Sequence, residues 1–255
     1  MILPISDDDR KLVKPAYVTW VLIAANVAMF LVQLGDPAVI YRFGAVAAEL
    51  TSGQDIAESI FLPVGENEAV EIPHQRGPWP IYLTLLTSMF LHGGWAHLLG
   101  NMLYLWIFGD NVEHRFGHLK FLIFYLASGL AASLAQIAIS PGSLTPMIGA
   151  SGAISGVLGA YLIRFPRNRV YVIFFFSIIS VPAVVVIVLW VVLQFIGGYA
   201  FLAGGQVGGV AYMAHLGGFA AGLATAFVSR LQFAQEPDTP LRRAYARDPN
   251  VYRIW

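Results

Sequence analysis

The chain has 255 residues, of which 57% are hydrophobic and only 12% are charged, and its formal net charge at pH 7 is zero. A soluble domain is rarely so apolar, and the balanced charge argues against a nucleic-acid partner. Because no cysteine is present, disulfides, thiolate catalysis and cysteine-based metal sites are excluded.

Apolar runs of membrane-spanning length recur along the chain, and we expect six transmembrane helices. They cover residues 17–34, 95–109, 121–139, 147–165, 181–199 and 210–228. The first run follows three aspartates and has no clear cleavage site after it, so we interpret it as a retained span rather than a signal peptide. The predicted fold class is an all-α polytopic membrane protein.

The distribution of lysine and arginine predicts how these spans are oriented. If both termini lie in the cytoplasm, thirteen of the fifteen basic residues fall in cytoplasmic segments, and only Arg42 and Arg76 fall outside. Such an excess on one side is the positive-inside pattern of multi-pass membrane proteins. Together with the absence of targeting signals, it leads us to expect a bacterial inner membrane.

These assignments divide the chain into three parts. We expect residues 1–16 to form a cytoplasmic leader, residues 17–230 the six-span domain, and residues 231–255 a cytoplasmic tail. Within the domain, a long external segment over residues 36–94 contains an apolar stretch, residues 81–91, that is too short to span a membrane. We expect this segment to lie partly in the membrane interface, and a plain surface loop is the alternative.

The fourth predicted span carries glycines at three- and four-residue intervals, namely Gly149, Gly152, Gly156 and Gly159. Small residues at this spacing allow helix backbones to approach closely. We therefore expect this span to be the central helix of the bundle. Residues 170–180, which follow it, are rich in β-branched and aromatic side chains and precede the fifth span.

Four polar side chains lie near the external ends of three spans that run in the same direction. His97 and Asn101 belong to the second span, Ser151 to the fourth and His215 to the sixth. Positions two to six residues into a helix lie roughly 3–9 Å below its end. The four groups therefore share one depth, which predicts a single site that is open to water from outside.

A serine and a histidine at one depth indicate nucleophilic catalysis. The hydroxyl of Ser151 needs a neighbouring base, and the imidazole of His215 is suited to that role. Gly152 follows the serine without bulk, so a substrate carbonyl can approach closely. The base has no acidic partner, and a serine–histidine dyad is predicted rather than a triad.

The missing acid follows from the positions of the carboxylates. Between residues 72 and 235 only Asp110 and Glu113 are acidic, and they lie about 10–20 Å in helical rise from the candidate site. Support for His215 must therefore come from packing or from a hydroxyl such as that of Ser155, one turn below the candidate nucleophile.

A developing oxyanion needs hydrogen-bond donors. We expect them from the amide of Asn101, the imidazole of His97 and the backbone near Ser151, including Gly149. A metal site formed by His92, His97 and His215 is not indicated, because no His-Glu-x-x-His motif is present and no carboxylate is near these three residues. No cofactor is expected.

Each residue alone has a simpler interpretation. The Gly-x-Ser-Gly sequence that contains Ser151 is usually a packing motif in a membrane helix, and His215 could equally serve in a proton relay. Asn101 alone is most often an interhelical hydrogen-bonding residue. Only the shared depth of these residues supports a joint function.

Taken together, the motifs resemble those of the rhomboid intramembrane serine proteases over about residues 15–230. The matching sequences are His97-x-x-x-Asn101, Gly109-x-x-x-Glu113-x-x-x-Gly117, Gly149-Ala150-Ser151-Gly152 and Ala214-His215-x-x-Gly218-x-x-x-Gly222. The resemblance implies a six-helix bundle in a lipid bilayer that cleaves single-span transmembrane proteins without a metal or cofactor. It also implies that the first external loop lies partly in the outer leaflet, and that the fifth span and the loop after it act as a gate.

The resemblance assigns roles to individual residues. Ser151 would be the nucleophile, His215 the general base, and His97 and Asn101 would stabilise the oxyanion. One position departs from the pattern, because some members carry an aromatic residue four positions after the serine, and here that residue is Ser155. We therefore expect a hydroxyl contact from Ser155 to the histidine.

Two other functions compete with proteolysis. A catalytically inactive relative that binds or retains membrane partners would typically have lost Ser151 or His215, and both are present. A small transporter would usually carry a titratable carboxylate at mid-membrane, and the predicted spans contain none at that depth.

Overall fold

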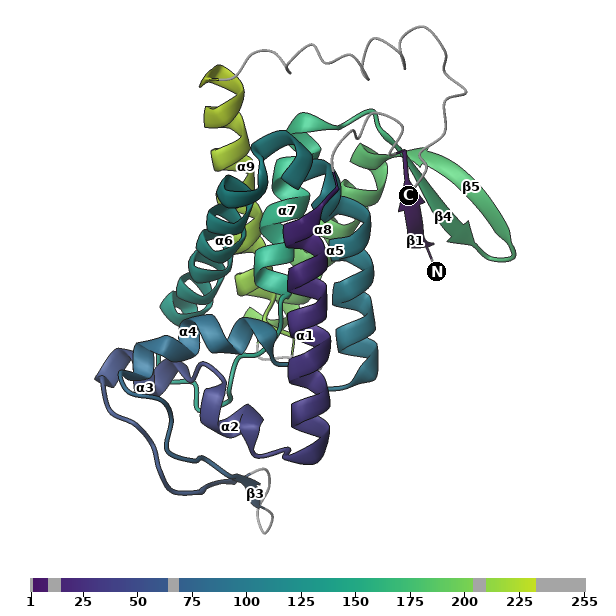
Figure 1. The fold of residues 1–255 in the computed structure, drawn as a ribbon. Coiled ribbons are helices and arrows are strands. Elements are labelled where there is room, and N and C mark those ends of the chain that lie inside the picture. The colour runs from purple at the N-terminus through teal and green to yellow at the C-terminus, as the bar shows by residue number, and fades with distance from the viewer. Residues whose placement is uncertain (1, 9–14, 64–68, 204–209, 233–255) are drawn as a thin grey trace, which may run out of the picture.

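A computed structural model describes residues 2–8, 15–63, 69–203 and 210–232 of the chain. Long helices dominate it and run side by side in one bundle (Figure 1). They are α1 (Tyr17–Gly35), α5 (Trp95–Phe116), α6 (His118–Ile139), α7 (Ser151–Arg164), α8 (Ala183–Leu202) and α9 (Tyr212–Gln232). The expected tail lies outside the described residues from position 233 onward.

Three of these helices, α1, α6 and α8, are long and apolar enough to cross a membrane by length and composition. The other three long helices carry more polar or small residues, and all the sequence-predicted site residues belong to them or to the residues just before them. The chain is thus a mostly helical membrane protein. The apolar helices present lipid-compatible surfaces, whereas the more polar helices meet in the interior.

The expectation that the fourth span is central is confirmed. Every residue of α7 from Ala153 to Tyr161 is buried. On α9, a Cβ atom at Gly222 would lie 1.9 Å from the carbonyl oxygen of Gly156. Only glycine permits this separation between two helix backbones. The small residues of α7 therefore determine how closely α9 approaches it.

The start of α7 is later than predicted. The fourth span was expected to begin at residue 147, but the helix begins at Ser151. Met147 instead pairs with Ala45 in an isolated β-bridge, and Gly149 has a φ of +120°. An extended strand-like segment and a backbone conformation that favours glycine are both incompatible with a helix. The serine is consequently the first helical residue, at the mouth of the bundle.

A buried carboxylate fixes α1 against the end of α5. Glu113 accepts hydrogen bonds from the backbone N–H of Val18 at 2.9 Å and from the N–H and hydroxyl of Thr19, each at 2.7 Å. The first N–H groups of a helix have no partner within it, and an acid there also complements the helix dipole. His118 Nδ1 contacts the same carboxylate at 2.5 Å. Glu113, which belongs to α5, therefore caps the N-terminus of α1, a helix far from it in the sequence.

The all-α prediction is wrong in detail, because the described chain also contains two small sheets. Antiparallel strands β1 (Ile2–Asp7), β4 (Arg169–Phe174) and β5 (Ser177–Pro182) form one sheet in the order β1-β4-β5. It lies beside the bundle, at the end where α7 finishes and α8 begins (Figure 1). The β-branched residues before the fifth span form this hairpin, and part of the expected leader forms its third strand.

The segment between α1 and α5 lies at the opposite end of the bundle (Figure 1). It contains α2 (Val39–Phe43), α3 (Ala47–Ser52), η1 (Ile81–Leu83), α4 (Thr84–Thr87), η2 (Ser88–Phe90) and the hairpin of β2 (Ile60–Pro63) and β3 (Ala69–Ile72). Trp79 and Tyr82 are exposed in it. An apolar helical stretch with exposed aromatic side chains is typical of a membrane interface, and that placement of the loop remains a prediction.

Candidate active site

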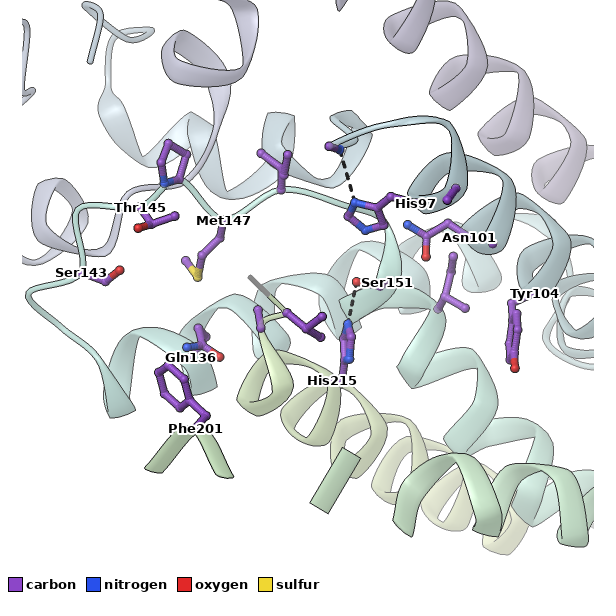
Figure 2. A pocket seen from close by; sticks show the side chains of 18 of the residues that line it. His97, Asn101, Tyr104, Gln136, Ser143, Thr145, Met147, Ser151, Phe201 and His215 are labelled. Atoms are coloured by element: carbon purple, nitrogen blue, oxygen red, sulfur yellow. Dashed lines mark hydrogen bonds between the residues drawn. The ribbon is translucent and has the colours of Figure 1, made fainter. Parts of the chain in front are cut away.

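A cavity of about 1140 Å³ lies at the end of the bundle opposite the β1-β4-β5 sheet. The first turns of α5, α7 and α9 surround it, together with the last part of α6 and residues of α8. His97, Asn101, Ser151 and His215 all line this cavity (Figure 2). The structure therefore brings together the four residues that the sequence places at one depth.

The serine and the histidine are in direct contact. His215 Nε2 lies 2.8 Å from Ser151 Oγ, so the hydroxyl can donate its proton to the imidazole (Figure 2). The two residues are 64 positions apart in the sequence and belong to α9 and α7. The close glycine contacts between these helices allow the side chains to meet. Proton transfer from the serine hydroxyl to the ring is geometrically possible without any rearrangement.

The second ring nitrogen of the histidine has a partner that the sequence analysis missed. His215 Nδ1 lies 2.7 Å from Gln194 Oε1, on α8. The ring of Trp190, one turn earlier on α8, lies 5.9 Å from the imidazole, measured between centroids. Gln194 is the only side-chain amide in α8 and it is buried. A lone amide in an apolar span was the signal that could have identified it.

The predicted contact between Ser155 and His215 is not formed. Ser155 is fully buried, and its hydroxyl donates to the carbonyl oxygen of Ser151 at 2.6 Å. The hydroxyl of a serine inside a helix often donates a hydrogen bond to the carbonyl oxygen four residues earlier. This local bond uses the hydroxyl, and Gln194 contacts the histidine instead.

Two side chains from α5 face the serine from the side opposite His215 (Figure 2). Asn101 is buried, and its Nδ2 has no hydrogen-bond partner among the described residues. His97 Nδ1 accepts a hydrogen bond from the N–H of Gly93 at 3.3 Å, so its proton lies on Nε2. Both groups therefore offer a donor at the cavity. Unused buried donors are costly to maintain and are typical of a site that binds an acceptor.

Gly149 is required for space rather than as a donor. A Cβ atom at this position would lie 2.8 Å from His97 Nε2, and the backbone has a φ of +120°. The expected oxyanion role of its N–H is not supported, because that N–H already donates to the carbonyl of Ser88 at 2.9 Å. The first turn of α7 still contributes backbone N–H groups without intrahelical acceptors, beginning at Ser151.

The two carboxylates of the membrane region are far from this cavity. Asp110 and Glu113 are buried near the other end of α5, where Glu113 binds α1 and Asp110 accepts a hydrogen bond from the N–H of Asn111. Neither lines the cavity. The orientation of the imidazole therefore depends on a neutral amide, and the geometry is that of a dyad.

Comparisons with known proteins identify the family. The model of the rhomboid domain matches residues 80–232. The rhomboid protease GluP of Bacillus subtilis is 38% identical over 143 residues, which cover 54% of this chain and 26% of that protein. In Arabidopsis thaliana, RHOMBOID-like protein 4 is 34% identical over 144 residues (56% of this chain, 33% of the relative), and RHOMBOID-like protein 1 is 30% identical over 202 residues (75% and 47%).

The chain spans less than half the length of each of these curated relatives. The matched domain contains α5, α6, α7, α8 and α9. All the residues that line the cavity lie within it. The protein is a multi-pass membrane protein, and it belongs to the rhomboid family.

Proposed function

We propose that this protein is an intramembrane serine endopeptidase that hydrolyses peptide bonds of single-span transmembrane proteins. The 2.8 Å contact between Ser151 Oγ and His215 Nε2, inside a cavity at one end of a membrane bundle, carries this proposal. Membership of a family whose relatives include a protein named a rhomboid protease supports it. No metal or cofactor takes part.

In the first half-reaction, Ser151 Oγ attacks the carbonyl carbon of the scissile bond while its proton moves to His215 Nε2. The protonated imidazole then donates that proton to the leaving amine as the carbon–nitrogen bond breaks. An acyl-enzyme remains on the serine. In the second half-reaction, the imidazole accepts a proton from water, the hydroxide attacks the ester, and the proton returns to the serine oxygen.

The negative charge that develops on the carbonyl oxygen requires donors on the side opposite the base. Asn101 Nδ2 and His97 Nε2 are oriented for this role, and the first N–H groups of α7 add backbone donors. Fixed donors in a site shielded from bulk water typically contribute about 10²–10³-fold each to the rate. Gly149 leaves room for the oxygen to approach them.

The placement in the membrane follows from the charge pattern. We propose that α1, α5, α6, α7, α8 and α9 are the six spans, with both termini in the cytoplasm and the cavity toward the external side of a bacterial inner membrane. Residues 17–230 then form the protease domain, whose external segment 36–94 lies partly in the interface. Residues 1–16 and 231–255 are cytoplasmic.

The test is covalent labelling of purified protein with a fluorophosphonate, followed by cleavage of a single-span substrate in vesicles. We expect labelling and cleavage in the wild type, and loss of both in Ser151→Ala and in His215→Ala. Ser177→Ala, exposed at the start of β5, is the matched control and should behave as wild type. Cleavage that survives in folded Ser151→Ala would overturn the proposal, and absence of labelling in the wild type would favour an inactive relative.

A further inference from the structure

The base of the dyad is held by a helix that carries neither of its members. Gln194 Oε1 of α8 is 2.7 Å from His215 Nδ1, and Trp190 of the same helix covers the ring. An amide oxygen can only accept a hydrogen bond, so the proton of a neutral imidazole must lie on Nδ1. Nε2 then has a free lone pair directed at Ser151 Oγ.

This tautomer is the one that catalysis requires. In the other tautomer, Nε2 would carry the proton and could not accept one from the serine hydroxyl. When Nε2 becomes protonated, the hydrogen bond from Nδ1 to the amide becomes charge-assisted and therefore stronger, which keeps the ring in its reactive orientation. A neutral amide thus supplies the orienting part of the role that an acid has in a triad, without adding a charge to the membrane interior.

The position of Gln194 depends on how α8 is seated against α9. Gly197 of α8 approaches α9 so closely that a Cβ atom there would lie 2.2 Å from the ring of Tyr212. The rest of the α8 surface is largely exposed and apolar. Gly198 is packed as closely, since a Cβ atom there would lie 2.5 Å from Met213 Cε, and these two glycine contacts with α9 set the distance from Gln194 to the imidazole.

We propose that Gln194 is a positioning residue that selects the reactive tautomer of His215, so that the dyad is competent only while α8 is seated against α9. This inference rests on the proposed function. It identifies the contact between Gln194 of α8 and His215 of α9 as the interaction that activates the base.

The test uses two variants of nearly equal size. Gln194→Met removes the acceptor and keeps the shape, whereas Gln194→Glu keeps an acceptor. We expect Gln194→Met to lower the rate of fluorophosphonate labelling and kcat about 10²–10³-fold, with KM changed less than about threefold. Gln194→Glu should retain most of the rate, and its pH–rate profile should move to higher pH, because a carboxylate holds the proton on the ring.

A direct readout separates positioning from folding. The ¹⁵N spectrum of the labelled imidazole should show the proton on Nδ1 in the wild type and a mixture of tautomers in Gln194→Met. Leu193→Met, on the exposed side of α8, is the matched control. Equal labelling rates and spectra in wild type and Gln194→Met would overturn the inference, whereas an unlabelled wild type would instead overturn the proposed function.

A second, independent observation concerns the β4–β5 hairpin. Its tip, Phe174 to Ile178, exposes three consecutive phenylalanines and an isoleucine, and Phe176 is fully exposed. The hairpin slants outward from the bundle and ends level with the helices rather than beyond them (Figure 1). Such an apolar cluster is unfavourable in water.

We propose that this tip is inserted into the membrane leaflet that holds the end of α7 and the start of α8. The exposed side chains of Arg167 and Arg169 lie at its base, where lipid phosphate groups would lie. Aromatic side chains below and arginines above are the arrangement of a segment that lies in the interface. Lipid therefore covers this surface, and the hairpin gives the domain a further contact with the membrane.

The absence of cysteine in the chain makes this measurable. A nitroxide attached to Phe176→Cys in vesicles of phosphatidylcholine and phosphatidylglycerol should be relaxed more by oxygen than by a water-soluble nickel chelate. Glu71→Cys, exposed on the other hairpin, is the control and should show the opposite preference. Equal access of the nickel chelate to both positions would overturn the proposal, and catalytic activity does not enter the result.

Discussion

Gly218 of α9 faces the backbone of α7 so closely that a Cβ atom at this position would lie 2.1 Å from the carbonyl oxygen of Gly152. The contact joins the residue directly after Ser151 to the residue three positions after His215, so it lies beside the pair that these two side chains form. Because the obstacle is backbone, no side-chain rotation can relieve a larger residue at position 218. The separation of the two helices, and with it the serine–histidine distance, depends on this glycine.

Gly218→Ala should therefore separate the catalytic pair without changing either member. We expect a loss of about 1–3 kcal/mol in stability, typical of overpacking, and a larger proportional loss of fluorophosphonate labelling. Thermal unfolding and labelling rate, measured on the same preparation, check both. Gly35→Ala, at the end of α1 with open space around it, is the control and should change neither. Wild-type labelling in Gly218→Ala would show that the helix separation is not critical.

Asn101→Ala tests the oxyanion donor, and we expect it to lower kcat without lowering stability. The rate should fall about 10²–10³-fold in kcat, because a donor to the transition state is lost. Stability should not fall, because Nδ2 has no partner among the described residues and its burial costs roughly 1–3 kcal/mol. Steady-state cleavage and thermal unfolding give the two numbers. A parallel loss of kcat and of melting temperature would indicate that Asn101 holds helices together instead.

Glu113→Gln should lower stability and leave the rate of cleavage unchanged, the reverse of Asn101→Ala. The carboxylate accepts three hydrogen bonds from Val18 and Thr19, and an amide can accept on one oxygen only. Hydrogen bonds to a buried charged group contribute about 1.5–3 kcal/mol, so we expect a loss of about 2–3 kcal/mol in stability. Cleavage per folded molecule should be unchanged, because the cavity is at the other end of α5.

Thr19→Val provides the partner variant for this prediction. It removes the hydroxyl donor and keeps the backbone N–H, so the double variant measures the coupling of the two side chains. Unfolding of all four proteins should give non-additive losses. Additive losses would mean that Glu113 acts on α1 through its backbone bonds alone.

The features that the sequence predicts correctly are those encoded within single helices. The position of Ser151 and His215 at the same end of the bundle follows from their places near helix starts, and the small residues of α7 indicate a close helix neighbour. Helical periodicity is a local property, so these features need no knowledge of the fold.

The features that the sequence does not predict are contacts between distant segments. Strand β1 pairs with β4 across more than half of the chain, and Gln194 meets His215 only because α8 lies against α9. Ser155 is the converse case, because the sequence predicts a contact to His215 that the structure does not form. Its local bond to Ser151 competes with the expected long-range contact, and the local bond forms because its partner is always within reach.

The external segment offers a prediction about pH. Burial raises the pKa of Glu49 on α3 above its ordinary value of 4.5, and the nearby Asp55 adds to the shift, although the N–H of Ile56 opposes it by donating to the carboxylate at 3.0 Å. The folded state therefore binds a proton more readily than the unfolded state does. Stability from this group is fully present below the unfolded pKa and is lost as the pH rises through the folded value.

Glu49→Gln removes the ionisation and keeps an oxygen that can accept from Ile56. We expect the variant to melt at a higher temperature than the wild type at pH 7, with the difference disappearing as the pH falls to about 4.5. Melting curves of both proteins across that range measure the effect. Glu71→Gln, on the exposed β3 strand, is the control variant for the substitution itself. If Glu49→Gln were less stable than the wild type at pH 7, the charged carboxylate would have to stabilise the loop through its bond to Ile56 by more than its burial costs.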